Sequence, residues 1–340
     1  MNETPITTIY RHKRHLLFAI DPVHVGTGGY RLGRVDLTIA REPGTNLPKI
    51  PGTSLSGAIR SYAAMQYNKI RCAGQGQTIS HCGSDSCPIC YTFGFAKGAD
   101  NGSAGTVSIS DAHILFFPVY SMDGPVWVST SVRLLEAGFN CNDKIPTAET
   151  ATTSLNDWSE PFLNLGWLLL PMENGLDVAP SGYTFDSESQ SLWDSLKDRI
   201  VLVTEKLFSQ IINSNLEVRT SVSINQKTGA AEDRGLYTYE AIPRGSWLFF
   251  DAIEDDYRRN PDNTSMFPET TKKCKIEVED EKEIEKDNEG EGLPQKWGQP
   301  FDVLESGLEL LQYLGVGGMG TRGFGRVRRA GFWKITNGGV

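Results

Sequence analysis

Short apolar runs bounded by glycine, proline and polar residues make up most of the hydrophobic pattern of the chain. Leu16–Ile20, Ile200–Val203 and Leu248–Ala252 are each four or five residues long, which is typical of buried strands. The chain is therefore expected to contain more strand than helix. The same pattern predicts further strands over residues 35–40, 106–119, 125–134 and 325–330.

Three segments show apolar residues at helical spacing instead. Residues 53–67 begin with Thr53 and Ser54, either of which can cap a helix. The other two predicted helices are residues 301–314 and a short stretch within residues 199–213. Because strands and helices alternate irregularly, we expect an α+β fold rather than a doubly wound parallel sheet. The apolar face of the first helix consists of Leu55, Ala58, Ile59, Tyr62 and Ala63.

Two strand-like segments late in the chain predict a long hairpin. They are Val218–Ile224 and Gly235–Ile242, and a polar segment of residues 225–234 joins them. This segment is long for a hairpin loop and carries Lys227 and Arg234.

The composition fits one large domain with insertions. The chain has 340 residues, of which 39% are hydrophobic, so it can form a sizeable core. It contains no run of 18 apolar residues and no signal-peptide pattern, which predicts a cytoplasmic protein that does not span a membrane.

The net charge of −9 is concentrated in one segment. Residues 277–291 hold nine acidic residues and two lysines, a net charge of −7, which leaves −2 for the rest of the chain. Basic residues elsewhere can therefore still gather on one nucleic-acid-binding face. The acidic run itself is typical of a solvated insertion, and a docking site for a basic partner is the alternative.

The cysteines point to a metal site. Cys72, Cys82, Cys87 and Cys90 lie within nineteen residues, and the last two form a CxxC knuckle. Zinc prefers four thiolate or imidazole ligands, so a structural zinc is predicted, with His81 as an alternative ligand to Cys82. Cysteines without a metal in a flexible loop are the other interpretation. The remaining cysteines, Cys141 and Cys274, are predicted to be unrelated to this site.

A glycine-rich segment follows the C-terminal helix. Residues 315–320 read GVGGMG and match the dinucleotide-binding pattern formally. A helix precedes them and a strand follows, which reverses the required order and excludes that interpretation. Backbone amides at Gly317 and Gly318, beside Arg322, could instead approach a polyanion closely. A tightly twisted start to the next strand is the alternative.

Residues 24–60 combine a glycine-rich turn, a strand-like run and the start of the first helix. Asp36 is the single acid in a strand-like run, and Arg60 lies in the helix that follows. This order favours a surface that binds a ribose-phosphate chain beside one carboxylate. His24 is a candidate for RNA contact and equally for a buried structural role.

Seven phrases in order carry a resemblance to a known family. They resemble the RAMP superfamily, specifically the backbone subunit of type III CRISPR effector complexes, and within it the Cmr (type III-B) variant. The resemblance spans about residues 14–252 and 301–330. The phrases are HVGTG, GRVDLTIARE, PKIPGTSLSGAIR, FGFA, SISDAHILFFPVYSMDG, TGAAEDRGLYTYEAIPRGSWLFF and GVGGMGTRGFGRVR.

The resemblance implies an architecture. It implies an RRM-like (ferredoxin-like) palm with insertions over residues 14–330 and a thumb hairpin at 218–240. The insertions in this chain are the zinc-stapled segment at 70–105 and the acidic segment at 254–296. The same resemblance implies that several copies line a CRISPR guide RNA together with other type III subunits, and that each thumb interrupts the duplex of guide and target RNA.

The resemblance also implies roles for residues. Asp36 matches the family's acid for target-RNA cleavage, with Mg²⁺ as its cofactor. Because an ordinary aspartate is a weak base at neutral pH, alignment of the ribose 2′-OH or metal binding is favoured over base catalysis. A structural Asp36 that caps a turn or pairs with Arg34 or Arg41 is the alternative. The expected RNA-binding residues are His24, Gly26, Ser54, Gly57, Arg60, Arg219, Lys227, Arg234, Gly317, Gly318 and Arg322.

The chain departs from the family in two places. Ser56 stands where the family usually has lysine, and the cysteine-rich segment resembles type III-D and III-E relatives more than the Cmr group. The leading function is a guide-dependent endoribonuclease subunit. A non-catalytic guide-RNA scaffold is the second, and a guide-maturation nuclease is the third, weakened because the chain has only five histidines.

Overall fold

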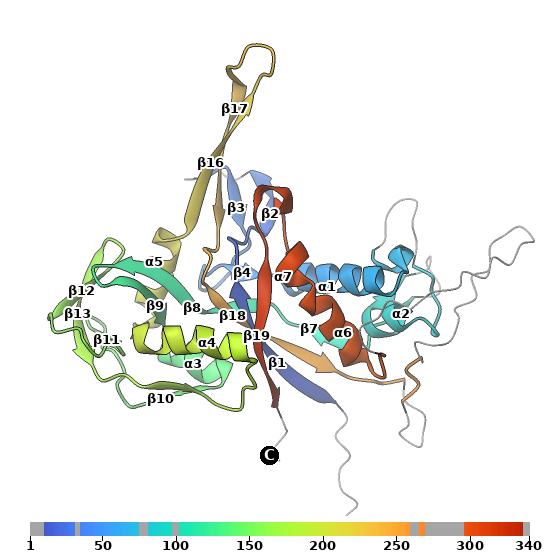
Figure 1. Cartoon of the computed structure of the whole chain (residues 1–340), viewed down its shortest axis with the longest axis horizontal. Helices are drawn as coiled ribbons and strands as arrows, with labels where there is room; N and C mark the ends of the chain where they lie inside the picture. Colours follow the sequence, from blue (N-terminus) through green and yellow to red (C-terminus); the bar gives the residue numbers. More distant parts are fainter. Residues whose placement is uncertain are drawn as a thin grey trace, which may run out of the picture.

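The structure is a computed structural model, and it describes residues 10–30, 35–74, 81–96, 102–258, 265–268 and 296–335. Its centre is an antiparallel sheet whose strands come from distant parts of the chain (Figure 1). Within these ranges no helix is both long enough and apolar enough to cross a lipid bilayer. The central strands, in spatial order, are β8 (Ala112–Ser121), β18 (Trp247–Glu254), β1 (Arg11–Ala19) and β19 (Val327–Ile335).

The central strands are buried on both faces. Leu16 and Leu17 are neighbours in β1 and are both fully buried, although successive strand residues point to opposite faces of a sheet. Helices must therefore cover both faces, which explains why the strands appear in the sequence as continuous apolar runs.

One face is covered by α1 (Gly52–Gln66), α6 (Pro300–Glu309) and α7 (Leu311–Leu314). The predicted helix over 301–314 is thus divided at Leu310. A Cβ placed on Gly307 would lie 2.1 Å from the Ile59 carbonyl oxygen, so α6 approaches α1 closely because residue 307 is glycine.

The start of α1 differs from the prediction. Its N-cap is Pro51, and neither Thr53 nor Ser54 provides a capping side chain. Asp111 takes that role from outside the helix, since its Oδ1 accepts a hydrogen bond of 2.7 Å from the Gly52 N–H.

The opposite face is covered by α3 (Ser131–Ala137) and α4 (Ser187–Leu196). The predicted strand over 125–134 is wrong at its end, because β9 (Gly124–Ser129) stops and α3 begins. Thr130 caps α3 by accepting a hydrogen bond of 3.2 Å from the Arg133 N–H.

The sheet continues beyond β8 through shorter strands, and α5 (Glu205–Ser214) packs its apolar residues into the same core. The strand predicted at 200–203 is present, whereas the polar region 140–160 contains a three-residue strand that its sequence does not reveal. In spatial order these strands are β9, β15 (Ile200–Leu202), β11 (Ala151–Thr153), β13 (Leu168–Asn174) and β12 (Phe162–Leu165).

Four further strands of the body are short. Two lie along the central sheet, where β4 pairs with β8 and β7 pairs with β18. The other two, β10 and β14, form a separate pair beside α3. Their bounds are β4 (Lys49–Ile50), β7 (Val107–Ile109), β10 (Phe139–Cys141) and β14 (Val178–Pro180).

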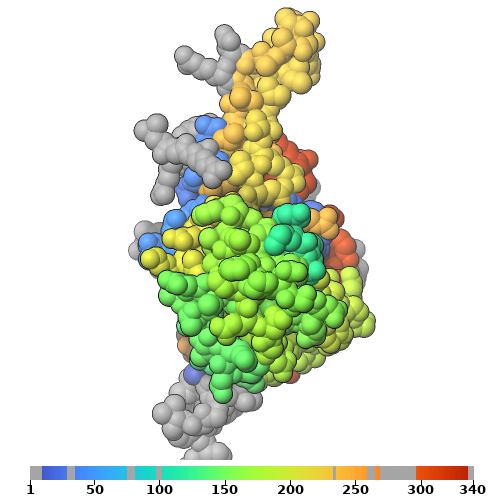
Figure 2. All heavy atoms as spheres, turned by 90° about the vertical axis from the view of Figure 1, so that its left-hand side faces the viewer, coloured from blue at the N-terminus to red at the C-terminus, as the bar shows by residue number. Residues whose placement is uncertain are grey.

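A long hairpin projects from the body. It is formed by β16 (Glu217–Ile224) and β17 (Ala231–Ala241), and it stands clear of the body in two perpendicular views (Figures 1 and 2). Both predicted strands are present. At its base, β17 pairs with β3 (Leu37–Ile39), which pairs with β2 (Gly26–Tyr30), so the predicted glycine-rich turn begins as an irregular strand.

The cysteine segment packs at the far end of α1, where it has short elements of its own. Its core contains Tyr67 and Trp297, whose rings stack 5.3 Å apart. Most of the acidic insertion, residues 259–264 and 269–295, lies outside the described residues. The short elements are the 3₁₀ turn Ile70–Cys72, α2 (Pro88–Phe93), β5 (Gly94–Phe95) and β6 (Ser103–Ala104).

Candidate nucleic-acid interface and metal centre

Asp36 is exposed at the base of the hairpin and is held there by Thr238 of β17. The Thr238 N–H and hydroxyl donate hydrogen bonds of 2.7 and 2.9 Å to Oδ2 of Asp36. The Asp36 N–H in turn donates to the Thr238 hydroxyl at 3.1 Å. These bonds fix the carboxylate on the hairpin and, among the described residues, leave Oδ1 without a hydrogen bond.

Of the two partners expected for a structural Asp36, Arg41 is paired elsewhere, since its Nη2 donates to both carboxylate oxygens of Glu240 at 2.8 Å. The other, Arg34, lies outside the described residues. The hydrogen bonds from the Thr238 backbone and side chain lower the pKa of Asp36 below its ordinary value. Asp36 is therefore an ionised, solvent-facing carboxylate, suited to binding a cation or a donor group and poorly suited to accepting a proton.

Aromatic rings and guanidinium groups line the base of the hairpin around Tyr237 and Tyr239 of β17. Tyr239 of β17 packs against Phe324, with ring centroids 5.4 Å apart. Arg219 lies over the Phe324 ring at 4.6 Å, and Arg322 lies over Tyr237 at 5.7 Å while donating to its hydroxyl. Two of the predicted RNA-binding arginines are thus brought together on one exposed surface.

His24 supports this surface from below. It is 5% exposed, and its Nδ1 forms a hydrogen bond of 2.7 Å with the Glu240 carbonyl oxygen. Its ring meets Tyr239 edge-on at 6.1 Å. Of the two interpretations of His24, the structure supports the buried structural role.

The glycine segment 315–325 packs against the His24 backbone. The Gly318 N–H donates to the His24 carbonyl oxygen at 2.8 Å, and a Cβ on Gly317 would lie 2.4 Å from the same oxygen. Both glycines are exposed to solvent. The close packing explains why glycine occupies position 317, and it places the loop next to Arg322.

Helix α1 reaches the same loop. The Tyr62 hydroxyl donates to the Gly315 carbonyl oxygen at 2.7 Å, which connects the middle of α1 to the glycine segment. Near the start of α1, Ser54 is half-buried, and Gly57 is exposed with no atom near its hypothetical Cβ. Gly26, in β2, is exposed beside the ring of His24.

Two of the basic residues of the hairpin, Lys227 and Arg234, lie away from this base. Lys227 is exposed in the tip, where its N–H donates to Asn225 Oδ1 at 2.9 Å. Arg234 lies in β17, and its side chain is outside the described part of the structure.

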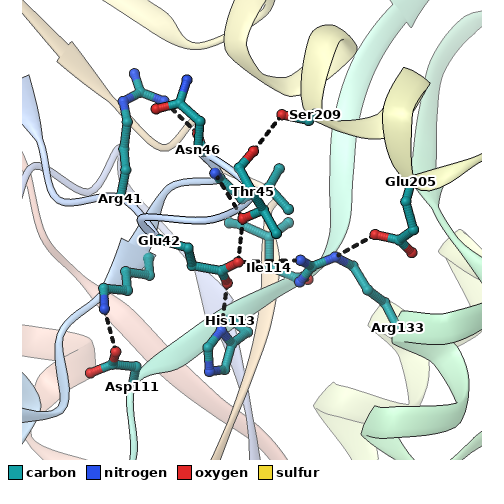
Figure 3. A network of polar contacts seen from close by, with 12 residues as sticks. Arg41, Glu42, Thr45, Asn46, Asp111, His113, Ile114, Arg133, Glu205 and Ser209 are labelled. Carbon is teal, nitrogen blue, oxygen red and sulfur yellow. Dashed lines mark hydrogen bonds and ion pairs between the residues drawn. The ribbon is translucent and has the colours of Figure 1, made fainter.

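A polar network, which the sequence did not reveal, surrounds the hairpin base, and its part around Glu42 joins the turn of residues 41–46 to β8 and α3 (Figure 3). Glu240 is buried and accepts hydrogen bonds from Arg41 and from the Ile39 N–H. Glu42 binds His113 at 2.6 Å, and Arg133 lies 3.6 Å away. These pairs join segments that are far apart in sequence.

The charges in this network perturb Glu42. Burial alone would raise the pKa of Glu42, but hydrogen bonds from His113 and Thr45 and the nearby charge of Arg133 lower it to about 2. Only the alternation of polar residues in β17, at positions 238 and 240, could have indicated that one face of this strand has polar partners.

The four predicted cysteines converge. The sulfurs of Cys72, Cys82, Cys87 and Cys90 all lie within 4.8 Å of one another, and none forms a disulfide. The separations are 3.6 Å for Cys82 and Cys90, 3.8 Å for Cys90 and Cys72, and 3.9 Å for Cys87 and Cys72. A tetrahedral zinc with Zn–S bonds of about 2.3 Å separates its sulfurs by about 3.8 Å, so the geometry fits zinc.

The close approach of the sulfurs keeps the metal-free cluster largely protonated. Hydrogen bonding with Cys72 raises the pKa of both the Cys87 and the Cys90 thiols. Several thiolates cannot occupy so small a buried volume unless a positive ion lies among them. His81 is buried beside the cluster, but it is not one of the converging groups.

Arg60 does not lie on the open surface where a phosphate contact was expected. It is 9% exposed, and its Nε and Nη1 donate to the carbonyl oxygens of Cys72 and Gly94 at 2.7 and 2.8 Å. The reason is that Arg60 lies on the face of α1 covered by the cysteine segment. The predicted role of Arg60 at the guide is corrected accordingly.

Comparison with known sequences places this geometry in a family. The RAMP superfamily matches residues 18–328. The chain is 29% identical over 250 residues to the CRISPR system Cmr endoribonuclease Cmr4 of Pyrococcus furiosus, a match that covers 70% of this chain and 79% of the relative. It is 22% identical over 307 residues to the CRISPR system Cms endoribonuclease Csm3 of Methanothermobacter thermautotrophicus, covering 90% and 77% of the two chains.

Solved structures share the fold. A chain of a type III-B Cmr-beta complex bound to cognate target RNA superposes with a TM-score of 0.58 at 15% identity, covering 95% of this chain and 96% of the other. Oligomeric Cmr4 from Pyrococcus furiosus gives a TM-score of 0.53 at 18% identity, covering 96% and 99%. The family inferred from the seven sequence phrases is confirmed, and the chain belongs to the RAMP superfamily.

Proposed function

We propose that this protein is a guide-RNA-binding backbone subunit of a type III CRISPR ribonucleoprotein and that it cleaves complementary target RNA. The exposed Asp36 at the base of a projecting hairpin, fixed by Thr238, is the observation that carries this proposal. The names of the relatives, both endoribonucleases of CRISPR systems, support it. In such a complex the partners are guide RNA, target RNA, other type III subunits and further copies of this chain.

The central sheet supports the proposed palm. The chain order β1, α1, β8, β18, α6, β19 and the spatial order β8, β18, β1, β19 are those of a β-α-β-β-α-β ferredoxin-like unit, to which RRM domains belong. In this assignment β16 and β17 form the thumb. Val218, Val222, Ile224 and Leu236 are exposed apolar residues along it, suited to contact unstacked bases.

The proposed guide surface lies between α1 and the glycine segment. Tyr62 holds these two elements together, and the glycine backbone and the start of α1 can approach phosphates closely. Arg219 and Arg322 add positive charge beside aromatic rings. The residues that we assign to this surface are Gly26, Ser54, Gly57, Arg219, Gly317, Gly318 and Arg322, with Lys227 and Arg234 contacting RNA from the thumb.

The proposed chemistry uses a nucleophile from the substrate. The ribose 2′-OH attacks the adjacent phosphorus when the thumb kinks the target strand. The bond from phosphorus to the 5′-oxygen of the next nucleotide breaks, which leaves a 2′,3′-cyclic phosphate and a 5′-hydroxyl, and the proton released by the 2′-OH passes through solvent to the leaving oxygen. Correct alignment alone can lower such a barrier by roughly 7–11 kcal/mol. Asp36 orients the reacting ribose through its charged oxygen. Because its pKa is lowered, Asp36 stays ionised and is not assigned the role of general base.

Magnesium is the proposed cofactor at Asp36. Within the described residues Asp36 does not belong to a group of three or more protein metal ligands. A single carboxylate fits Mg²⁺, which commonly binds one or two carboxylates together with substrate phosphates and water. When bound, Mg²⁺ would supply charge stabilisation at the phosphate.

Zinc is the proposed structural metal of the cysteine cluster. Its four sulfur ligands leave no open coordination position, which supports a structural role and argues against a catalytic one. The segment has a small core of its own around Cys72, Ile89 and Trp297, and a metal would join it to α1.

The test separates the endoribonuclease from a scaffold that binds guide RNA without cutting. The complex would be assembled with Asp36→Ala and supplied with labelled target RNA. We expect guide content to be unchanged and cleavage to fall by about 10²–10⁴-fold, the range for a positioned catalytic group. The matched control is Asp194→Ala, which removes an exposed aspartate paired with Lys197 on α4.

Each result has a clear meaning. Loss of cleavage with Asp36→Ala and normal cleavage with Asp194→Ala supports the enzyme. Unchanged cleavage with Asp36→Ala would refute the role of Asp36, and a wild-type complex that binds target without cutting it would favour the scaffold. A guide-maturation nuclease is disfavoured because His15, His24 and His81 are buried.

A further inference from the structure

Arg60 connects helix α1 to both arms of the cysteine cluster. The first arm is the 3₁₀ turn that ends at Cys72, and the second is the segment that carries Cys87 and Cys90. Its Nε donates to the carbonyl oxygen of Cys72, which belongs to the first arm. Its Nη1 donates to the carbonyl oxygens of Phe93 and Gly94 at 3.4 and 2.8 Å, directly after the second arm with Cys87 and Cys90. One guanidinium group therefore spans the two arms that bring the sulfurs together.

The charge of Arg60 has no carboxylate partner. It is 9% exposed, and among the described residues no aspartate or glutamate forms an ion pair with it. Its Nη2 is buried without a hydrogen-bond partner in the described residues. A buried cation in this state is costly unless negative charge lies nearby.

The cysteines supply that negative charge once they hold a metal. Arg60 donates to the carbonyl oxygen of Cys72 itself, so its guanidinium lies directly beside the cluster. A divalent ion with four thiolates carries a net charge of −2. That charge would offset the cost of burying the Arg60 cation.

We propose that Arg60 is a positioning residue of the cysteine metal centre, which holds the two cysteine arms together and balances part of the charge of the four thiolates. This inference rests on the proposed zinc site. It gives α1 a second role, because the helix that we assign to the guide surface also contains Arg60, the residue that would position the metal ligands. The planar fork of arginine suits this task, since it can donate to several carbonyl oxygens at once.

The test measures zinc affinity of the purified full-length protein by competition with a chromogenic zinc chelator. Arg60→Gln removes the charge and most of the donors, whereas Arg60→Lys keeps the charge but not the fork. Arg71→Gln is the matched control, because it removes the same charge from the adjacent 3₁₀ turn, where no hydrogen bond of the Arg71 side chain is found among the described residues.

We expect one zinc per wild-type chain, a loss of affinity of about 10–100-fold for Arg60→Gln, and a smaller loss for Arg60→Lys. Arg71→Gln should stay within about threefold of wild type. If Arg60→Gln does not fold, Arg60→Lys decides alone. Affinities of both Arg60 variants equal to wild type would overturn the role of Arg60 while leaving zinc in place, and a wild-type chain without zinc affinity would overturn both.

Discussion

Thr238 donates two hydrogen bonds to a single oxygen of Asp36, from its N–H at 2.7 Å and from its hydroxyl at 2.9 Å. The two residues are 202 positions apart in the chain. The pairing attaches the proposed cleavage residue to the thumb itself, so that any movement of β17 moves the carboxylate with it. If the thumb interrupts the RNA duplex as proposed, that interruption and the positioning of Asp36 are linked in one element.

Removing the Thr238 hydroxyl should slow cleavage without abolishing it. Thr238→Val keeps the backbone hydrogen bond and the branched shape but loses the side-chain donor to Asp36. Because a hydrogen bond to a charged group contributes about 1.5–3 kcal/mol, we expect target cleavage by the assembled complex to fall about tenfold or more, with guide content unchanged.

The conservative substitution is the control for this prediction. Thr238→Ser retains a hydroxyl at the same position and should restore most of the cleavage rate. If Thr238→Val cleaved at the wild-type rate, the hydroxyl would have no part in holding Asp36 for catalysis.

The sequence predicted correctly those elements whose structure depends on residues close together in the chain. The hairpin strands were recognisable because polar and apolar residues alternate over 218–224, and the cysteine cluster was recognisable because CxxC brings two ligands together in one turn. Helix α3 was missed although its signals are present. Thr130 caps its start, and Gly138 ends it with a φ of +81°, but the apolar residues between them read as a strand.

The features that the sequence did not reveal depend on contacts between residues that are far apart in the chain. Arg60 lies on a helix, but only the position of the cysteine segment determines that its face of α1 is covered. Thr238 has no charge or motif that marks it as the partner of Asp36. The glycines of residues 26–30 read as a turn, but pairing with β3 extends them into an irregular strand.

The glycine segment offers a matched pair of substitutions. Gly317 has a φ of +89°, and an added Cβ would lie 2.4 Å from the His24 carbonyl oxygen. Gly317→Ala should therefore destabilise the fold by about 2 kcal/mol or more. At Gly318 the nearest atom to an added Cβ is 3.7 Å away, in ordinary contact, so Gly318→Ala should be almost neutral.

Denaturant unfolding of the two glycine variants and the wild type checks this difference. Equal stabilities for Gly317→Ala and Gly318→Ala would mean that the loop does not pack against His24 as described. RNA binding by Gly318→Ala can then be measured in a protein whose fold is intact.

His15 should make the stability of the protein depend on pH. It is fully buried against Phe250, with ring centroids 5.0 Å apart, and neither ring nitrogen has a hydrogen-bond partner among the described residues. Burial, together with the nearby charges of Arg329 and Lys13, lowers the pKa of His15 from 6.5 to about 3.

The direction in which stability changes with pH follows from proton linkage. Between about pH 6.5 and 3 the unfolded chain binds a proton at residue 15 that the folded chain does not, so stability falls as the pH falls. At about pH 5 this amounts to about 2 kcal/mol relative to neutral pH. His15→Phe should lose correspondingly less stability over this range, and parallel curves of unfolding free energy against pH for the two proteins would contradict the prediction.

Guide binding should depend steeply on salt, and Arg322 should carry part of that dependence. Each cation that contacts a phosphate releases a counterion. For single strands, each such contact makes the slope of log affinity against log salt concentration more negative by about 0.7. Arg322 is exposed beside Tyr237 and the glycine segment, so Arg322→Gln should make this slope shallower by about 0.7. It should also lower the affinity for guide RNAs of every sequence equally.

Arg199→Gln is the control, since Arg199 is held by Asp123 at the β8–β9 turn and should leave the slope unchanged. Fluorescence anisotropy with labelled guide RNA over a range of potassium chloride concentrations measures both slopes, and the same slope for wild type and Arg322→Gln would remove Arg322 from the guide surface.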